Sequence, residues 1–195
     1  QISLYEELVR KGNSTHSVDE VVNFASIKIG NCLIFCDKKF RILSYSTSIP
    51  VTDVLWKENI ERGYCTYEFI SNVMSLEAVQ SSSANIEAIE VSCPESPYRK
   101  CSSKVFLNGV QVGFVLMIES VTAFTTEHLA AMSDISRAIS FVVGRYHPEL
   151  LRYSSADQQL LEALLIGTPA ELLKEAIAHL HMSDAMYALC VQPQS

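Results

Sequence analysis

Two periodicities in the spacing of apolar residues predict a chain of mixed helices and strands. Helical spacing predicts helices at residues 3–10, 17–30 and 51–62, the first ended by Gly12-Asn13 and the third by Gly63. Ser17 and Glu20 have the spacing of a capping box and mark where the second helix begins. Short apolar runs predict strands, namely a hairpin formed by CLIFC and FRILSYS, and a further strand over residues 86–91.

A second hairpin, formed by residues 99–107 and 110–119, is the most specific local prediction. Its turn is Asn108-Gly109, the dipeptide that type I′ geometry prefers, and a two-residue turn sets the cross-strand register. The expected pairs are Leu107 with Val110, Val105 with Val112, Ser103 with Phe114, Cys101 with Leu116, and Arg99 with Ile118. Arg99, Cys101 and Ser103 are therefore expected on one face that is otherwise apolar.

A long helix is predicted from Thr125 to about Tyr146. Its apolar stripe has a mean spacing near the value of about 3.5 that coiled coils show, and consists of Leu129, Met132, Ile135, Ile139, Val142 and Tyr146. The stripe would pair with its copy in a homodimer through residues 124–146, or it would pack on the core of its own chain. Both interpretations stay open at this point.

The residues after His147-Pro148 predict a second, incomplete domain. Helix-start signals at Ser155 and Thr168-Pro169 predict helices over 156–166 and 169–181, and residues 186–191 predict a strand. No later segment is present to pair with that strand, and an unpaired apolar strand is an unusual domain end. We expect one domain at 1–147 and the truncated beginning of a second α/β unit at 148–195.

Composition and charge narrow the class of protein. Hydrophobic residues make up 48% of the 195 positions, which is enough for a sizeable core. Fifteen basic residues against 22 acidic ones give a net charge of −7, which disfavours direct contact with nucleic acid. No apolar run reaches the roughly 20 residues of a membrane span, and no signal peptide opens the chain. A cytoplasmic location without membrane contact is expected.

The six cysteines do not predict a metal site or a disulfide framework. No CxxC motif occurs, and Cys32 and Cys36 lie four residues apart on a predicted strand. Their Cα atoms are then about 13 Å apart, too far for a disulfide or for one zinc ion. Reduced, buried thiols are expected, with no metal and no cofactor.

Several longer runs carry a family resemblance. The runs NCLIFCDKKFRILSYS, ERGYCTYEFI, CPESPYRKCSSKVFLNGVQVGFVLMIES and FTTEHLAAMSDISRAISFVV resemble the N-terminal GAF-like domain of PucR/CdaR-type bacterial transcription regulators. The tail from ADQQLLEALLIG to YALCV resembles the start of the degenerate GGDEF-like domain that follows it. The resemblance implies an α+β fold, with a GAF- or PAS-like antiparallel sheet and flanking helices.

The resemblance also implies a function. In that family the front domain is taken to sense a small metabolite, and DNA is bound by a helix-turn-helix that this chain does not contain. The chain is therefore expected to be a sensory domain and not an enzyme. The main alternative is a dimerisation module whose interior is filled by side chains.

Arg99 suggests what such a ligand would carry. A guanidinium on an apolar face needs an anion, and a ligand carboxylate held by Arg99 beside Cys101 and Ser103 would supply one. The alternative is that Arg99 lies at the end of its strand and pairs with Glu119 or with solvent.

Further candidate ligand residues precede that strand or lie on it. Trp56, Tyr64, Cys65 and Tyr67 lie close together in the sequence and either line a pocket or form core. Ser96 lies in a loop that leads into a strand with two lysines, Lys100 and Lys104, the second expected opposite Gly113.

Cys65 supports an enzymatic alternative, because some GAF proteins are cysteine-dependent methionine sulfoxide reductases. That chemistry requires a thiol of lowered pKa and a second, resolving thiol.

Overall fold

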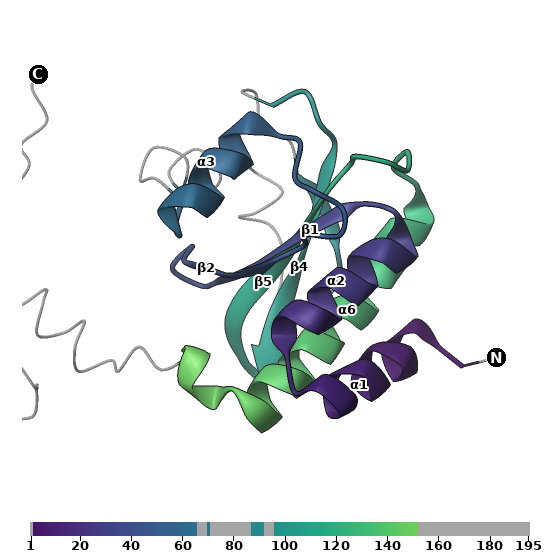
Figure 1. Cartoon of the computed structure of the whole chain (residues 1–195), viewed down its shortest axis with the longest axis vertical. Helices are drawn as coiled ribbons and strands as arrows, with labels where there is room; N and C mark the ends of the chain where they lie inside the picture. The colour runs from purple at the N-terminus through teal and green to yellow at the C-terminus, as the bar shows by residue number, and fades with distance from the viewer. Residues whose placement is uncertain (1, 66–69, 71–86, 92–95, 152–195) are drawn as a thin grey trace, which may run out of the picture. The chain divides into compact units, whose positions relative to one another are not determined.

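The structure, a computed structural model, describes residues 2–65, 70, 87–91 and 96–151. Its elements (Figure 1) are α1 (Leu4–Thr15), α2 (Val18–Ile29), β1 (Cys32–Asp37), β2 (Ile42–Tyr45), α3 (Val54–Arg62), β3 (Ile89–Val91), β4 (Lys100–Leu107), β5 (Val110–Ile118), α6 (Thr126–Tyr146) and the 3-10 helix η1 (Pro148–Leu151). The chain divides after Leu151 into two units. The second domain expected at 148–195 falls almost entirely outside the described residues, so it stays a prediction.

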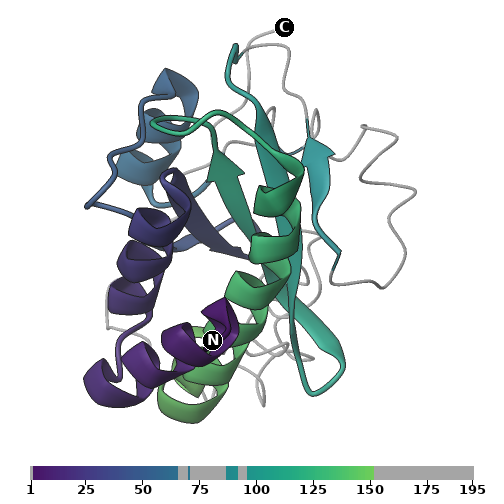
Figure 2. The same cartoon turned by 90° about the vertical axis from the view of Figure 1, so that its right-hand side faces the viewer.

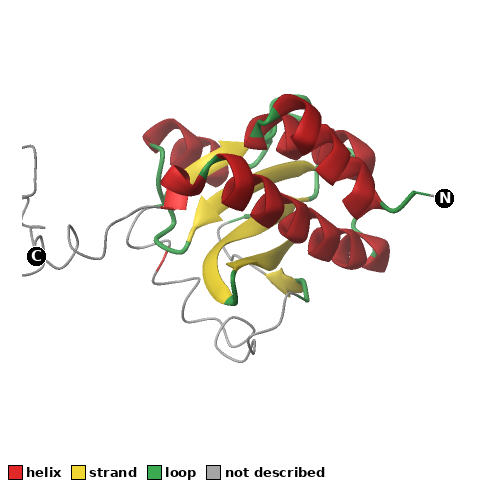
Figure 3. Ribbon diagram, turned by 90° about the horizontal axis from the view of Figure 1, so that it is seen from below, coloured by secondary structure: helices red, strands yellow, loops and turns green. Residues whose placement is uncertain are grey.

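The five strands form one antiparallel sheet in the order β2-β1-β5-β4-β3. Helices α1, α2 and α6 pack on one face and α3 on the other, so that helices are layered against the strands (Figures 2 and 3). The predicted α+β class, with an antiparallel sheet and flanking helices, is confirmed. None of the described helices combines the length and hydropathy that crossing a membrane requires.

The local start, stop and turn signals of the sequence are mostly confirmed. The Ser17 side chain caps α2 by accepting a hydrogen bond from the Glu20 N–H, and Gly30 ends that helix with φ 70°. Gly63 ends α3 in the same left-handed conformation. Asn108 and Gly109 both have positive φ, as a type I′ turn requires.

Helix α1 continues past Gly12, where the sequence analysis placed its end, to Thr15. Gly12 is buried, and a Cβ atom placed on it would lie 2.3 Å from Cγ2 of Val142 in α6. The glycine therefore permits a close approach of two helices and does not end one. The end comes at His16, which has φ 55° and donates its N–H to the Gly12 carbonyl.

The predicted register of the β4–β5 hairpin is wrong beyond its turn. Leu107 pairs with Val110 as expected, but Val105 pairs with Gly113 and not with Val112, so β5 contains one extra residue. The remaining pairs are Lys104 with Phe114, Ser103 with Val115, Ser102 with Leu116, Cys101 with Met117, and Lys100 with Ile118. A slip of one residue exchanges the two faces, so Phe114, Leu116 and Ile118 lie on the face opposite Cys101 and Ser103.

The extra residue is held by contacts to β1. The Val112 carbonyl accepts a hydrogen bond from the Lys38 N–H at 3.1 Å, in the turn that follows β1. Gly113 lies beside the last residues of β1, and a Cβ atom on it would be 2.1 Å from the Cys36 carbonyl oxygen. A β-bulge with a glycine beside it lets β1 approach β5 closely here.

The apolar stripe of α6 packs within its own chain. Met132, Ile135, Ile139 and Val142 are fully buried in the core that α1, α2, β4 and β5 share, and Leu129 and Tyr146 are partly buried against it. This stripe is therefore core, and it cannot also pair with a second copy. The homodimer predicted through residues 124–146 loses the feature that suggested it.

His147 joins the end of α6 to the end of α1. Its Nε2 lies 2.5 Å from the His16 carbonyl oxygen, and its Nδ1 lies 3.0 Å from a carboxylate oxygen of Glu149. The neighbouring Tyr146 ring stacks on the His16 ring with 4.3 Å between centroids. The His16 carbonyl, more than the Glu149 carboxylate, raises the pKa of His147 above 6.5.

We expect Gly113→Ala to lower the free energy of unfolding by about 3 kcal/mol, because the new methyl group meets backbone that cannot rotate away. Gly109→Ala is the matched comparison: its Cβ would meet nothing within 4 Å, and only the φ of 79° opposes it, at a cost of about 1 kcal/mol. Urea denaturation measures both. A loss at Gly113 no larger than that at Gly109 would contradict the close approach.

We expect His147 to stabilise the domain more at low pH than at high pH. Because its pKa is higher in the folded state, the contribution is complete below the ordinary value of 6.5 and is lost as pH rises through the raised pKa. The stability difference between wild type and His147→Gln, measured by urea denaturation from pH 5.5 to 8.5, should shrink as pH increases. A difference that stays constant over this range would refute the assignment.

Candidate ligand-binding site

The sheet face under α3, here called the α3 face, is an apolar floor with a charged end. The register places three rows across β4, β5 and β1 on this face, namely Lys100–Ile118–Cys32, Ser102–Leu116–Ile34 and Lys104–Phe114–Cys36. Ile118, Leu116 and the three β1 residues belong to one apolar cluster with Trp56. Lys100 is only 2% exposed, so the charged end is inside the protein.

Helix α3 presents its buried residues to this face at a spacing of three. Asp53, Trp56 and Asn59 are 2%, 2% and 0% exposed. Asp53 is the N-cap residue, and its Oδ1 accepts a hydrogen bond from the Leu55 N–H at 3.0 Å. The cap therefore fixes the start of α3 and turns the second carboxylate oxygen toward the sheet.

A buried ion pair connects α3 to β4. The Lys100 ammonium lies 3.0 Å from Oδ2 of Asp53, with side-chain exposures of 2% and 3%. Ser96 donates its hydroxyl to the same Oδ2 at 2.6 Å. Lys100 also donates to the Ser96 hydroxyl and, at 3.0 Å, to the Tyr98 carbonyl. The three ammonium protons thus have three partners, and the cluster is neutral as a whole.

Asn59 is the polar side chain on this face that the fold does not satisfy. Neither its Nδ2 nor its Oδ1 has a hydrogen-bond partner among the residues that the structure describes. Each buried, unpaired amide atom costs about 1–3 kcal/mol. A group that pairs with Asn59 would recover that free energy, and a bound ligand can supply such a group.

Three buried thiols of the sheet, those of Cys32, Cys36 and Cys101, are not activated. Burial, followed by the neighbouring Cys65, raises the pKa of Cys36 well above its usual value. Burial also raises the pKa of Cys32, and on the other face it raises that of Cys101 to about 12. The thiols of Cys32, Cys36 and Cys101 are protonated near neutral pH, and a protonated thiol is a poor nucleophile.

Three of the predicted site residues lie at the α3 face. Trp56 and Cys65 are buried in its apolar cluster, and Ser96 belongs to the ion-pair cluster. Tyr64 is 55% exposed at the surface. Tyr67 lies outside the described residues.

Arg99, Cys101 and Ser103 do not lie at the α3 face, because the register of the β4–β5 hairpin differs from the predicted one. Cys101 and Ser103 are buried on the opposite face, under α6, where the Ser103 hydroxyl donates to Ser136 at 3.0 Å. Arg99 precedes β4 and is 51% exposed, in a two-bond ion pair with Glu90 at 2.8 and 3.0 Å. Arg99 is thus at the strand end, as its alternative interpretation proposed, but with Glu90 as its partner. The apolar face expected for Arg99 is wrong, and its guanidinium already has a carboxylate partner in Glu90.

The sequence analysis missed Asp53 and Asn59, and it did not predict that Lys100 is buried. A sequence signal for Asp53 and Asn59 was present, because each lies three residues from Trp56 and so shares its side of a helix. No comparable signal existed for Lys100, because its position depends on the extra residue in β5.

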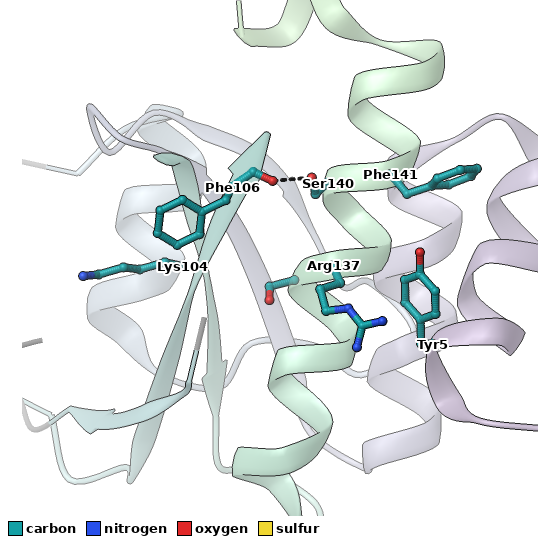
Figure 4. A pocket seen from close by; sticks show the side chains of 7 residues that line it. Tyr5, Lys104, Phe106, Arg137, Ser140 and Phe141 are labelled. Carbon is teal, nitrogen blue, oxygen red and sulfur yellow. Dashed lines mark hydrogen bonds between the residues drawn. The ribbon is translucent and has the colours of Figure 1, made fainter. Parts of the chain in front are cut away.

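A second hollow lies between α1, β4 and α6 (Figure 4). Its volume is about 230 Å³, and it is lined by Tyr5, Lys104, Phe106, Ser136, Arg137, Ser140 and Phe141. The Arg137 guanidinium lies over the Tyr5 ring and bonds Asp134 at 3.2 Å, and Ser140 donates to the Phe106 carbonyl. This hollow can accept a small anion at Arg137, but the Ser136 and Ser140 hydroxyls already donate to the carbonyls of Ser133 and Phe106.

Comparisons with other proteins found matches only among solved structures: no protein-family model and no curated protein matches the sequence. The GAF domain of the nutrient sensor CodY from Clostridium difficile is similar, with 10% identity, a TM-score of 0.46, and coverage of 70% of this chain and 91% of that one. The DhaR N-terminal part in the E. coli DhaR–DhaL complex has 16% identity, 85% and 58% coverage, and a TM-score of 0.42.

The phycocyanobilin-bound GAF domain of a cyanobacterial phytochrome has 8% identity, 76% and 98% coverage, and a TM-score of 0.46. All three TM-scores are below 0.5.

We expect Lys100→Met to lower the free energy of unfolding by about 3–5 kcal/mol, because it leaves the Asp53 carboxylate buried without its cation. The double variant Asp53→Asn/Lys100→Met removes both charges and keeps a good N-cap, so it should recover most of the loss. Lys104→Met is the control on the same strand and should cost less than about 1 kcal/mol. Equal losses for the single and double variants in urea denaturation would exclude the ion pair as the cause.

Proposed function

We propose that this chain carries the ligand-sensing domain of a cytoplasmic one-component transcription regulator of the PucR/CdaR type. A small metabolite binds between α3 and the sheet, and the response passes to a DNA-binding helix-turn-helix outside this chain. The sequence runs that resemble this family support the regulator type. The net charge of −7 agrees with a domain that does not contact DNA itself.

The observation that carries the proposal is the buried, unpaired amide of Asn59 on an otherwise apolar face. Folded proteins rarely leave both atoms of a buried amide unsatisfied. On this face the other buried polar groups, Asp53, Ser96 and Lys100, satisfy one another. The amide with both ends unsatisfied therefore lies on α3, the helix that the ion pair positions.

Two backbone hydrogen bonds and one from the Arg41 guanidinium offer a route from α3 to η1. Directly after α3, Gly63 accepts from the Ile42 N–H and Cys65 donates to the Phe40 carbonyl, both at 2.9 Å. Between these two contacts, Arg41 donates to the Leu150 carbonyl at 2.7 Å. A ligand that favours one position of α3 would shift the population of this linked arrangement, and η1 is where the described residues end.

Two alternatives have less support. A pure dimerisation module would use the α6 stripe, and that stripe is buried within the chain. A cysteine-dependent reductase needs a thiol of lowered pKa, whereas burial raises the pKa of Cys36 and Cys101. We therefore propose a binding domain and not an enzyme.

The single tryptophan of the chain gives a direct test. Trp56 is buried on the α3 face, so its emission reports on this site alone. The family that the sequence resembles is taken to sense sugar acids and products of purine degradation. Among these compounds, we expect at least one to raise Tm by several degrees and to change the Trp56 emission. Binding at about 100 times Kd adds roughly 2.7 kcal/mol of stability, which is a shift of that size.

Trp56→Phe is the control: it should keep the Tm shift and lose the emission change. A Tm shift without any change in emission would place the ligand elsewhere, for example at Arg137. No shift from any compound, together with a stable dimer in sedimentation, would favour the dimerisation module.

A further inference from the structure

The charges around the α3 face bear on the kind of ligand it accepts. Lys100 is neutralised by Asp53, and its three protons already have acceptors. Arg99 is held by Glu90 outside the core. Among the described residues, the buried part of this face therefore has no net positive charge with which to offset an incoming carboxylate. Burying an uncompensated charge is strongly unfavourable.

Asn59 specifies the complementary chemistry. Its side chain offers two N–H donors on Nδ2 and a carbonyl acceptor, Oδ1, in one plane. Both ends are unpaired and the residue is 0% exposed. A partner that satisfies both ends needs an acceptor and a donor side by side. A carboxylate has acceptors only, so it would pair with Nδ2 and oppose Oδ1.

We propose that Asn59 binds a neutral ligand through a planar edge that carries a carbonyl next to an N–H. Primary amides, lactams and ureas have this edge. The ligand carbonyl accepts from Nδ2 and the ligand N–H donates to Oδ1, which forms two parallel hydrogen bonds. This inference rests on the proposed function, since it names the class of ligand for the same site.

The neighbours of Asn59 suit such a group. Trp56 lies one turn earlier on the same buried face of α3 and provides an aromatic surface for a planar molecule. The apolar cluster beneath α3 includes Ile34, Leu116 and Ile118. The Asn59 side chain is 0% exposed, so it is shielded from bulk water. In an apolar environment each of the two hydrogen bonds is stronger than in water.

The test uses the full chain and three probes of similar size. 2-Pyrrolidinone has the donor and the acceptor, N-methyl-2-pyrrolidinone lacks the donor, and butyrate carries a charge. Titrations followed by NMR report on the Asn59 side-chain NH₂ resonance, which is assigned by its loss in Asn59→Leu. We expect 2-pyrrolidinone to move this resonance saturably, the N-methyl compound to bind about tenfold more weakly, and butyrate to have no effect.

Stability gives a second, independent measurement. Asn59→Leu removes an unsatisfied amide and should leave Tm unchanged or raise it. Asn23→Leu is the matched control, because the Asn23 amide is satisfied: it donates to the Asp19 carbonyl and accepts from Thr47 and Ser48. That variant should lower Tm.

Three results would overturn the inference. Butyrate binding as well as 2-pyrrolidinone would show that the site takes anions. Equal binding of the N-methyl compound would show that the donor is not used. A lowered Tm for Asn59→Leu with no response to any probe would show that Asn59 holds a buried water. If a metabolite still raises Tm and changes the Trp56 emission in any of these cases, the proposed function stands and only the class of ligand is wrong.

Discussion

The extra residue in β5 determines which side chains each face of the sheet carries. Because Val112 is accommodated in a bulge, Lys100 shares a face with Ile118 and comes within 3.0 Å of Asp53 on α3. Without the extra residue in β5, Lys100 would lie on the opposite face of the sheet, which α1, α2 and α6 cover. The bulge is possible because residue 113 is glycine, which allows the backbone of β1 to come close. A backbone contact between β1 and β5 thus controls the electrostatics of a site one strand away.

The ion pair that results has a positional role more than a stabilising one. Removing two charged groups from water costs several kcal/mol per ion. The attraction between the two charges offsets this cost only when hydrogen bonds satisfy their remaining donors and acceptors. The hydrogen bonds are complete here, because Lys100 also donates to the Ser96 hydroxyl and to the Tyr98 carbonyl. Such a pair fixes where α3 begins along the sheet. The helix then carries Trp56 and Asn59 over the apolar floor in a defined orientation.

Local signals of the sequence were sufficient for the elements, but not for the site. Ser17, Gly63 and Asn108-Gly109 act through their own backbone, so the segments around them could be predicted. The register could not, because the bulge depends on contacts from the Val112 carbonyl and from Gly113 to a strand some 75 residues earlier. Of the predicted ligand residues, those on β4 were assigned to the wrong face for that reason. Trp56 and Cys65 were grouped by their proximity in the sequence and by the family resemblance, and both lie at the α3 face.

The two faces of the sheet differ in how they treat buried polar groups. Under α6, the Ser103 and Ser136 hydroxyls bond one another, and Asn31 accepts from the Ser120 and Thr122 N–H groups. Under α3, one amide is left unpaired beside a complete ion-pair cluster. If stability alone determined these residues, buried polar groups would be paired on both faces. An apolar residue of similar size at position 59 would then give a more stable fold than the unpaired amide. Since natural chains break local rules mainly where function requires it, the difference supports a binding role for the α3 face.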